Sequence, residues 1–108
     1  MKRTLIGIAA VAAGLAFAAP AHADPDTDFA NELHTYGIYG QKDYNAWIGK
    51  IACKRLRNRV DNDANKSAQF VHMNLDKDST TEQSYQFLGA ALRTYCPDQM
   101  PILEQLAR

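Results

Sequence analysis

Residues 79–97 read STTEQSYQFLGAALRTYCP and predict the clearest helix of the chain. Ser79 precedes Glu82 by three residues, which is the spacing of a capping box at a helix start. Apolar residues then recur at helical intervals, at Tyr85, Leu88, Ala91, Leu92 and Tyr95. Because Pro97 disfavours helical geometry at the residue before it, the helix is expected to end at Cys96. The stretch therefore predicts an amphipathic helix that ends in a cysteine.

Three more helices are predicted upstream by the same helical period. The first follows cap candidates in Asp24–Asp28 and ends at Gly37, the second is capped by Asp43, and the third is capped within Asp61–Asp63. Their apolar faces are expected to be Phe29, Leu33 and Tyr36; then Tyr44, Trp47, Ile48, Ile51, Ala52, Leu56 and Val60; then Ala64, Ala68, Val71 and Leu75, widened by Phe70 and Met73. Pro101 starts one further short turn. We therefore predict an all-α fold, a small bundle of about four short helices.

The beginning of the chain has the pattern of a secretory signal peptide. Met1–Arg3 is basic, Thr4–Ala19 is almost wholly apolar, and Ala21–Ala23 offers a small-residue cleavage site. The apolar run is too short and too rich in Ala and Gly to span a bilayer, so no transmembrane anchor is expected. We predict a cleaved signal peptide over residues 1–23 and a single helical domain over residues 24–108. This domain is expected to be secreted or held in the cell envelope.

The charge balance argues against nucleic acid as a partner. Without the predicted signal peptide the chain carries ten Lys and Arg against twelve Asp and Glu, a net charge of −2. Such a balance produces no long-range field that attracts an anionic polymer or membrane, so binding of this kind would depend on a local patch. A chain of this size buries only roughly 60% of its unfolded surface, and it therefore needs reinforcement.

Cys53 and Cys96 are the two cysteines of the chain. After export they meet an oxidising environment, where two thiols in a small domain favour a structural bond. The alternative is a redox couple, but catalytic pairs usually have Cys-x-x-Cys spacing and an accessible thiolate. We prefer the structural hypothesis, and it leaves no cysteine nucleophile.

Basic residues in the last turns of the second predicted helix form a candidate binding surface. Its members are Lys50, Lys54, Arg55, Arg57 and Arg59. They can bind an anionic lipid headgroup, a polysaccharide or an acidic partner. The plainer interpretation is that they complement the negative end of the helix dipole and pair with the acidic residues of the first helix, Asp24, Asp26, Asp28 and Glu32.

Aromatic residues around the first turn offer a second candidate. The spacing assigns Tyr36, Tyr44 and Trp47 to the core, whereas Tyr39 beside Gly40 is expected to be exposed and joins the candidate binding surface. The histidines after the predicted signal peptide, His34 and His72, lack the close spacing of metal ligands. No metal and no cofactor are therefore expected.

The sequence contains no Gly-x-Ser-x-Gly, no phosphate-binding loop and no His-Glu-x-x-His. Glu82 is explained as a capping-box partner rather than as a catalytic acid. We therefore expect no enzyme, and two hypotheses remain. The preferred one is a secreted interaction module for an unknown macromolecular or envelope partner, with a filled core and an exposed apolar or basic patch. The other is a small carrier of a lipid or other apolar ligand, with a pocket bordered by Trp47, Tyr85 and Leu88.

The chain resembles the small exported proteins of actinobacteria, especially mycobacteria, that are grouped as domain of unknown function (DUF) 732. The resemblance rests on Phe29-x3-Leu33-x3-Gly37-Ile38, Trp47-x5-Cys53 and Phe87-x3-Ala91-x3-Tyr95-Cys96-Pro97. It implies a compact helical fold, a Cys53–Cys96 disulfide and an envelope or extracellular location, and it brings no activity. In this family pattern a glycine tends to follow the helix of the first cysteine. This chain has Arg57–Arg59 there, so a different helix end is expected.

Overall fold

The computed structural model describes residues 24–107, which form helices joined by short turns. The elements are α2 (Pro25–Thr35), α3 (Lys42–Arg57), α4 (Ala64–Asn74), α5 (Thr81–Tyr95), the 3₁₀ turn η4 (Pro97–Gln99), the short α6 (Pro101–Glu104) and the 3₁₀ turn η5 (Gln105–Ala107). No strand occurs within this range. The prediction of an all-α fold of about four short helices is confirmed, with α6 as the further turn. The predicted signal peptide lies outside the described residues.

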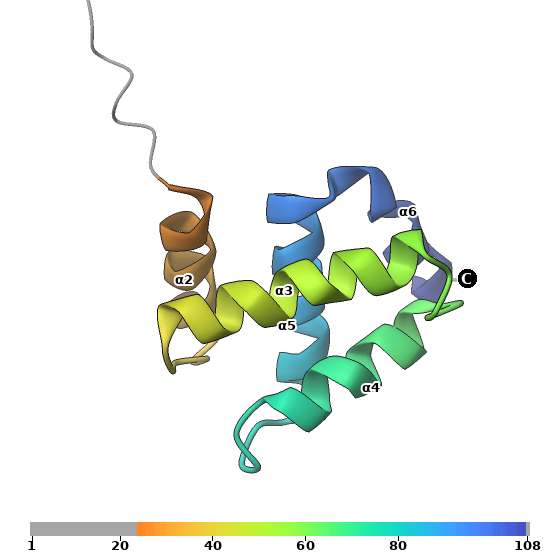
Figure 1. The fold of residues 1–108 in the computed structure, drawn as a ribbon. Helices are drawn as coiled ribbons and strands as arrows, with labels where there is room; N and C mark the ends of the chain where they lie inside the picture. Colours follow the sequence, from red (N-terminus) through yellow and green to blue (C-terminus); the bar gives the residue numbers. More distant parts are fainter. Residues whose placement is uncertain (1–23, 108) are drawn as a thin grey trace, which may run out of the picture.

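Helix α5 lies at the centre of the fold, where it contacts α2, α3 and α4. In Figure 1, α3 crosses in front of α5, and α2 and α4 lie on opposite sides of the view. The segment from Phe87 to Leu92 is buried on every side of α5, as expected for a helix with neighbours all round. Within residues 24–107, no helix combines the length and the apolar character needed to cross a membrane.

The interior consists of two apolar clusters. One joins α2 to α5, where the ring of Phe29 packs edge-to-face against Phe87 at 5.1 Å and Tyr95 at 5.2 Å. The other surrounds the cysteines and includes Ala52, Leu56, Ala64, Ala68, Leu88 and Leu92. Gly49 of α3 permits the first packing, because a Cβ at this position would lie 3.2 Å from the rings of Phe29 and Tyr95.

The helix starts confirm two of the predicted caps and correct two others. Asp24 accepts a hydrogen bond from the amide of Asp26 at 3.2 Å, and Asp63 accepts one from Lys66 at 2.9 Å. Helix α3 starts after Gln41, which makes no side-chain cap, so Asp43 lies in the first turn and the prediction that it is the cap is wrong.

The capping box of α5 lies one residue later than predicted. It joins Thr80 to Gln83, with hydrogen bonds of 3.0 and 2.9 Å, and does not join Ser79 to Glu82. Gln83 also donates a hydrogen bond to the carbonyl oxygen of Tyr36 at 3.1 Å. The side chain that completes the capping box therefore also contacts the turn that follows α2.

Helices α2 and α3 end in the same backbone motif. After α2, the amide of Ile38 bonds to the carbonyl of Leu33 at 3.0 Å around Gly37, whose φ is 77°. After α3, the amide of Val60 bonds to the carbonyl of Arg55 at 2.8 Å around Arg59, whose φ is 59°. Glycine adopts this left-handed conformation without strain, whereas other residues pay a steric cost. Arg59 therefore ends α3 with the same backbone geometry that Gly37 gives to the end of α2.

Several predicted core positions are exposed. Trp47 is 58% exposed and Met73 is 76% exposed, and Tyr44 and Val60 are exposed as well. The buried residues of α3 are Asn45, Ala46, Ile48, Gly49, Ala52, Cys53 and Leu56. Four of them, Ala46, Gly49, Ala52 and Cys53, are small. Small side chains let α3 approach α5 closely, and Cys53 must face α5 to reach Cys96. The aromatic stripe of α3 consequently lies on the outer side.

Candidate functional site

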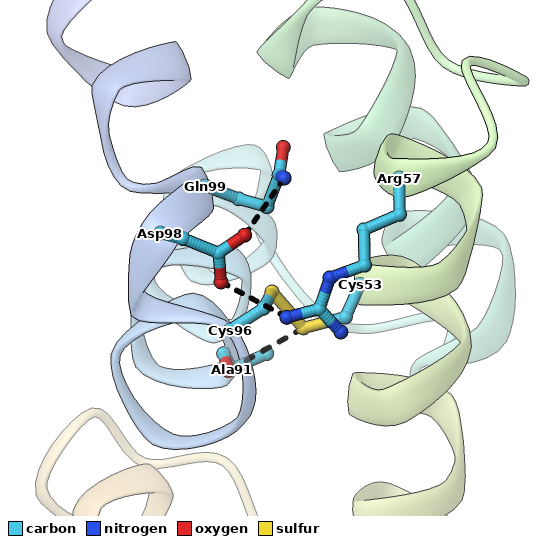
Figure 2. Close-up of a disulfide and its surroundings, with 6 residues drawn as sticks. All are labelled: Cys53, Arg57, Ala91, Cys96, Asp98 and Gln99. Atoms are coloured by element: carbon cyan, nitrogen blue, oxygen red, sulfur yellow. Dashed lines mark hydrogen bonds and ion pairs between the residues drawn. A yellow bond between two sulfur atoms is a disulfide. The ribbon is translucent and has the colours of Figure 1, made fainter.

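Cys53 and Cys96 form a disulfide between the middle of α3 and the end of α5, with a Cα–Cα distance of 5.9 Å. Both residues are buried, at 3% and 0% exposed. Figure 2 shows that Arg57, one turn after Cys53, reaches back beside the sulfur atoms to bind Asp98 of η4 at 2.9 Å. No free cysteine remains in residues 24–107. The disulfide and the adjacent ion pair thus link the same two segments.

Lys50 lies in a cluster that joins three helices. Its ammonium lies 3.2 Å from a carboxylate oxygen of Asp26 in α2 and 5.4 Å from the ring centre of Tyr95 in α5. The hydroxyl of Tyr95 donates to Asp26 at 2.6 Å. This hydrogen bond and the nearby Lys50 lower the pKa of Asp26, while burial and the Asp26 carboxylate raise the pKa of Tyr95. The predicted pairing between the basic residues and the first helix is therefore confirmed for Lys50.

Arg55 pairs with a different segment. Its guanidinium donates two hydrogen bonds of 2.9 Å to the buried carboxylate of Asp61 and lies 4.4 Å from the ring centre of Phe70. The hydroxyl of Ser67 completes the coordination of Asp61 at 3.1 Å. Asp61 therefore holds α3 against α4. The prediction that the basic residues pair with the acidic residues of α2 is wrong for Arg55.

Arg57 also pairs outside α2. Its partner is Asp98, which comes two residues after Cys96 of the disulfide. The hydrogen bond from Arg57 lowers the pKa of Asp98. Lys54 and Arg59 are exposed, and neither forms an ion pair with another residue of the described range. Of the five basic residues, these two keep an uncompensated charge.

Tyr39 is exposed as predicted, at 66%, and its ring lies 4.9 Å from that of His34. It lies in the turn between α2 and α3, whereas Arg59 follows the other end of α3 (Figure 1). Since α3 has sixteen residues, these ends are about 24 Å apart. The structure therefore does not bring the predicted binding residues together into one site.

An exposed aromatic face was not predicted from the sequence. We call it the outer face of α3 and define it by Tyr44, Trp47, Ile51 and Lys54, which recur at helical spacing. Ile51 is half-buried and the other three are exposed. The rings of Tyr44 and Trp47 are 6.0 Å apart, and the hydroxyl of Tyr44 lies 3.3 Å from the carbonyl oxygen of Asn74. The sequence signal that could have revealed it is the competing stripe of small residues, Ala46, Gly49, Ala52 and Cys53.

A groove of about 540 Å³ lies between α4 and α5. Ala68, Met73 and Tyr85 contribute apolar surface, and His72 Nδ1 lies 2.9 Å from the buried Ser84 hydroxyl. This groove is not the pocket predicted for a carrier, because Trp47 belongs to α3 and Leu88 is fully buried in the core. Among the described residues, no group of three His, Cys, Asp or Glu side chains converges to hold a metal.

These features define a small helical domain linked by one buried disulfide. Residues 25–98 match the family described as "Protein of unknown function (DUF732)", and the chain belongs to this family. It is 46% identical to uncharacterised proteins from two strains of Mycobacterium tuberculosis, over 97% of this chain and 96% of each relative. No solved structure matches the chain. The resemblance read from the sequence is thereby confirmed.

Proposed function

We propose that this protein is a non-catalytic interaction module that works outside the cytosol, in the cell envelope or in the medium. It binds a protein partner through the outer face of α3. The observation that carries this proposal is the exposure of Trp47, 58% of which remains accessible on a helix whose inner face is fully packed. The location is supported by the buried disulfide, since such bonds persist in oxidising compartments.

The chemistry of the outer face suits a partner with an apolar pocket and an acidic rim. Tryptophan, tyrosine and arginine are the side chains that most often dominate binding energy at protein interfaces. Trp47 is the centre of this face, and Tyr44 and Ile51 extend its apolar area. Lys54 adds a positive charge that has no ion-pair partner among residues 24–107. An acidic side chain on the partner would pair with Lys54, while the Trp47 ring would fill the pocket.

The decisive experiment compares Trp47→Ala with Met73→Ala. Both residues are exposed and apolar, so both variants should fold, but Met73 borders the α4–α5 groove instead. Protein purified after export of the full chain is applied to an immobilised mycobacterial envelope fraction. Trp47→Ala should weaken retention about tenfold or more, as expected for an interface anchor, and Met73→Ala should leave it unchanged. Equal retention of both variants and the parent would refute the proposal.

The α4–α5 groove favours a second candidate function, a small carrier of an apolar ligand. Its volume of about 540 Å³ lies within the range of small-molecule sites. Native mass spectrometry of the exported protein tests this candidate. A bound mass that Met73→Glu removes and Trp47→Ala retains would support the carrier, and a spectrum of bare chain would count against it.

A further inference from the structure

A polar depression of about 290 Å³ lies where α3 ends. The residues that line it include Arg57, Arg59, Asp61, Asn62, Gln99 and Ile102. The depression thus brings the residues that follow α3 together with η4 and α6, two segments about forty residues later in the chain. It lies beyond the C-terminal end of the outer face of α3 and on the side of η4.

The charges around this depression do not cancel completely. Arg55 neutralises Asp61 through two hydrogen bonds, and the Ser67 hydroxyl donates a third to the same carboxylate. Asp98 is neutralised by Arg57. Arg59 makes no ion pair within residues 24–107, so one positive charge remains at the wall. An anionic group is the chemical complement of the Arg59 guanidinium at this wall.

The backbone adds an independent argument. Arg59 has a φ of 59°, in the left-handed region where glycine is favoured and a longer side chain is strained. The hydrogen bonds that end α3 join backbone groups of residues 54–61 and do not use the Arg59 side chain, so glycine would serve them equally well. A strained arginine that lines a cavity and makes no ion pair with any described residue is the kind of outlier that points to a ligand.

We propose that this depression is an oxyanion-binding site whose ligand is a phosphate group, and that the Arg59 guanidinium is its main contact. Arginine suits this task because its planar guanidinium can donate two parallel hydrogen bonds to two phosphate oxygens. Arg57 also lines the depression and keeps N–H groups beyond the one that binds Asp98. The site is separate from the partner-binding face proposed above, so either can fail alone.

Inorganic phosphate is the probe that tests the site. The exported protein is titrated with phosphate at constant ionic strength, and binding is followed by backbone and guanidinium NMR shifts. Saturable shifts should centre on Arg59, Asn62 and Gln99. Arg59→Gly should weaken binding about tenfold or more, as expected for loss of a charge-assisted hydrogen bond, while the protein remains folded because glycine fits the backbone. Lys54→Gln removes the same charge from α3 outside the depression and should bind phosphate as the parent does.

Equal weakening by Lys54→Gln and Arg59→Gly would overturn the proposal, because it would show attraction to net charge alone. Linear, unsaturable shifts spread over the basic surface would overturn it as well. A second arm uses phosphatidylglycerol vesicles to distinguish the two sources of a phosphate group. Co-sedimentation of the parent but not of Arg59→Gly identifies a lipid headgroup, and saturable phosphate binding without co-sedimentation identifies a free phosphate.

Discussion

The hydroxyl of Tyr95 donates a hydrogen bond of 2.6 Å to the carboxylate of Asp26, although the two residues are 69 positions apart. It joins the last residue of α5 to the first turn of α2. Lys50 of α3 binds the same carboxylate, so one acidic side chain ties together three helices. The next residue, Cys96, forms the disulfide with Cys53 of α3. The end of α5 is therefore anchored to α2 by a hydrogen bond and to α3 by a covalent bond.

Loss of this hydrogen bond should change the pH dependence of stability. The pKa of Asp26 is lowered in the folded state, so its contribution is present above the usual value near 3.8 and disappears as the pH falls through the lower folded value. Tyr95→Phe should cost about 1.5–3 kcal/mol at pH 7, because the hydrogen bond has a charged acceptor. Urea unfolding at pH 7 and below pH 3 measures both effects. The difference between parent and variant should shrink at the acidic pH; a constant difference would contradict this account.

The same hydroxyl predicts an effect at alkaline pH. Burial and the neighbouring Asp26 raise the pKa of Tyr95 far above its ordinary value of 10, so its contribution is complete below pH 10 and is lost as the pH rises above it. Tyr95→Phe lacks the ionisable group and should lose less stability than the parent between pH 9 and pH 11. Thermal unfolding across this range is the measurement, and parallel curves would argue against it.

Removal of the disulfide should strongly destabilise the fold. Cys53→Ala with Cys96→Ala opens a loop with a sequence separation of 43 residues, and loss of such a bond in a small domain costs about 2–5 kcal/mol. Chemical denaturation of the oxidised parent and the double variant gives the difference. Arg57→Ala, which deletes only the exposed ion pair beside the disulfide, is the control and should change stability by less than about 1 kcal/mol. A double variant as stable as this control would refute a structural role for the bond.

The left-handed backbone at Gly37 and at Arg59 predicts that glycine gives the more stable protein at both positions. Gly37→Ala should destabilise the protein by about 1 kcal/mol, and Arg59→Gly should stabilise it by a similar amount, because both positions have a left-handed backbone. Lys54→Gly is the control, since glycine inside a helix costs about 1 kcal/mol. Melting temperatures of the three variants are compared with the parent. A lower melting temperature for Arg59→Gly would show that the arginine side chain stabilises the fold.

The carboxylate of Asp61 should be the acidic group whose removal costs most. Its side chain is 2% exposed and accepts hydrogen bonds from Arg55 and Ser67, which Asp61→Ala would leave unpaired. We expect a loss of about 2–3 kcal/mol, below the roughly 3–5 kcal/mol of a fully buried pair because Arg55 is partly accessible. Equilibrium unfolding in urea measures the loss. Asp76→Ala, at an exposed position, should stay within about 0.5 kcal/mol of the parent.

The helices and most of their ends could be predicted from the amino-acid sequence because they depend on nearby residues. Helical periodicity, the caps at Asp24 and Asp63, and the glycine at position 37 all act through hydrogen bonds that span only a few positions. The two cysteines, together with the predicted signal peptide, likewise indicated a stabilising bond. The aromatic residues of α3 were visible in the sequence too, but whether they face the core or the solvent was not.

Which face of a helix turns toward the core depends on how the helices pack together. The face of α3 that turns inward is the one with small side chains, since it must approach α5 and bring Cys53 to Cys96. Trp47 is left outside for that reason, although its hydrophobicity alone would place it in the core. The partners of Arg55 and Arg57 were equally hidden, because Asp61 and Asp98 reach them only after the chain has turned and α5 has docked. Local hydrogen bonding thus determined the elements, whereas their rotation, the exposed face and the charge left on Arg59 depend on contacts between residues distant in the chain.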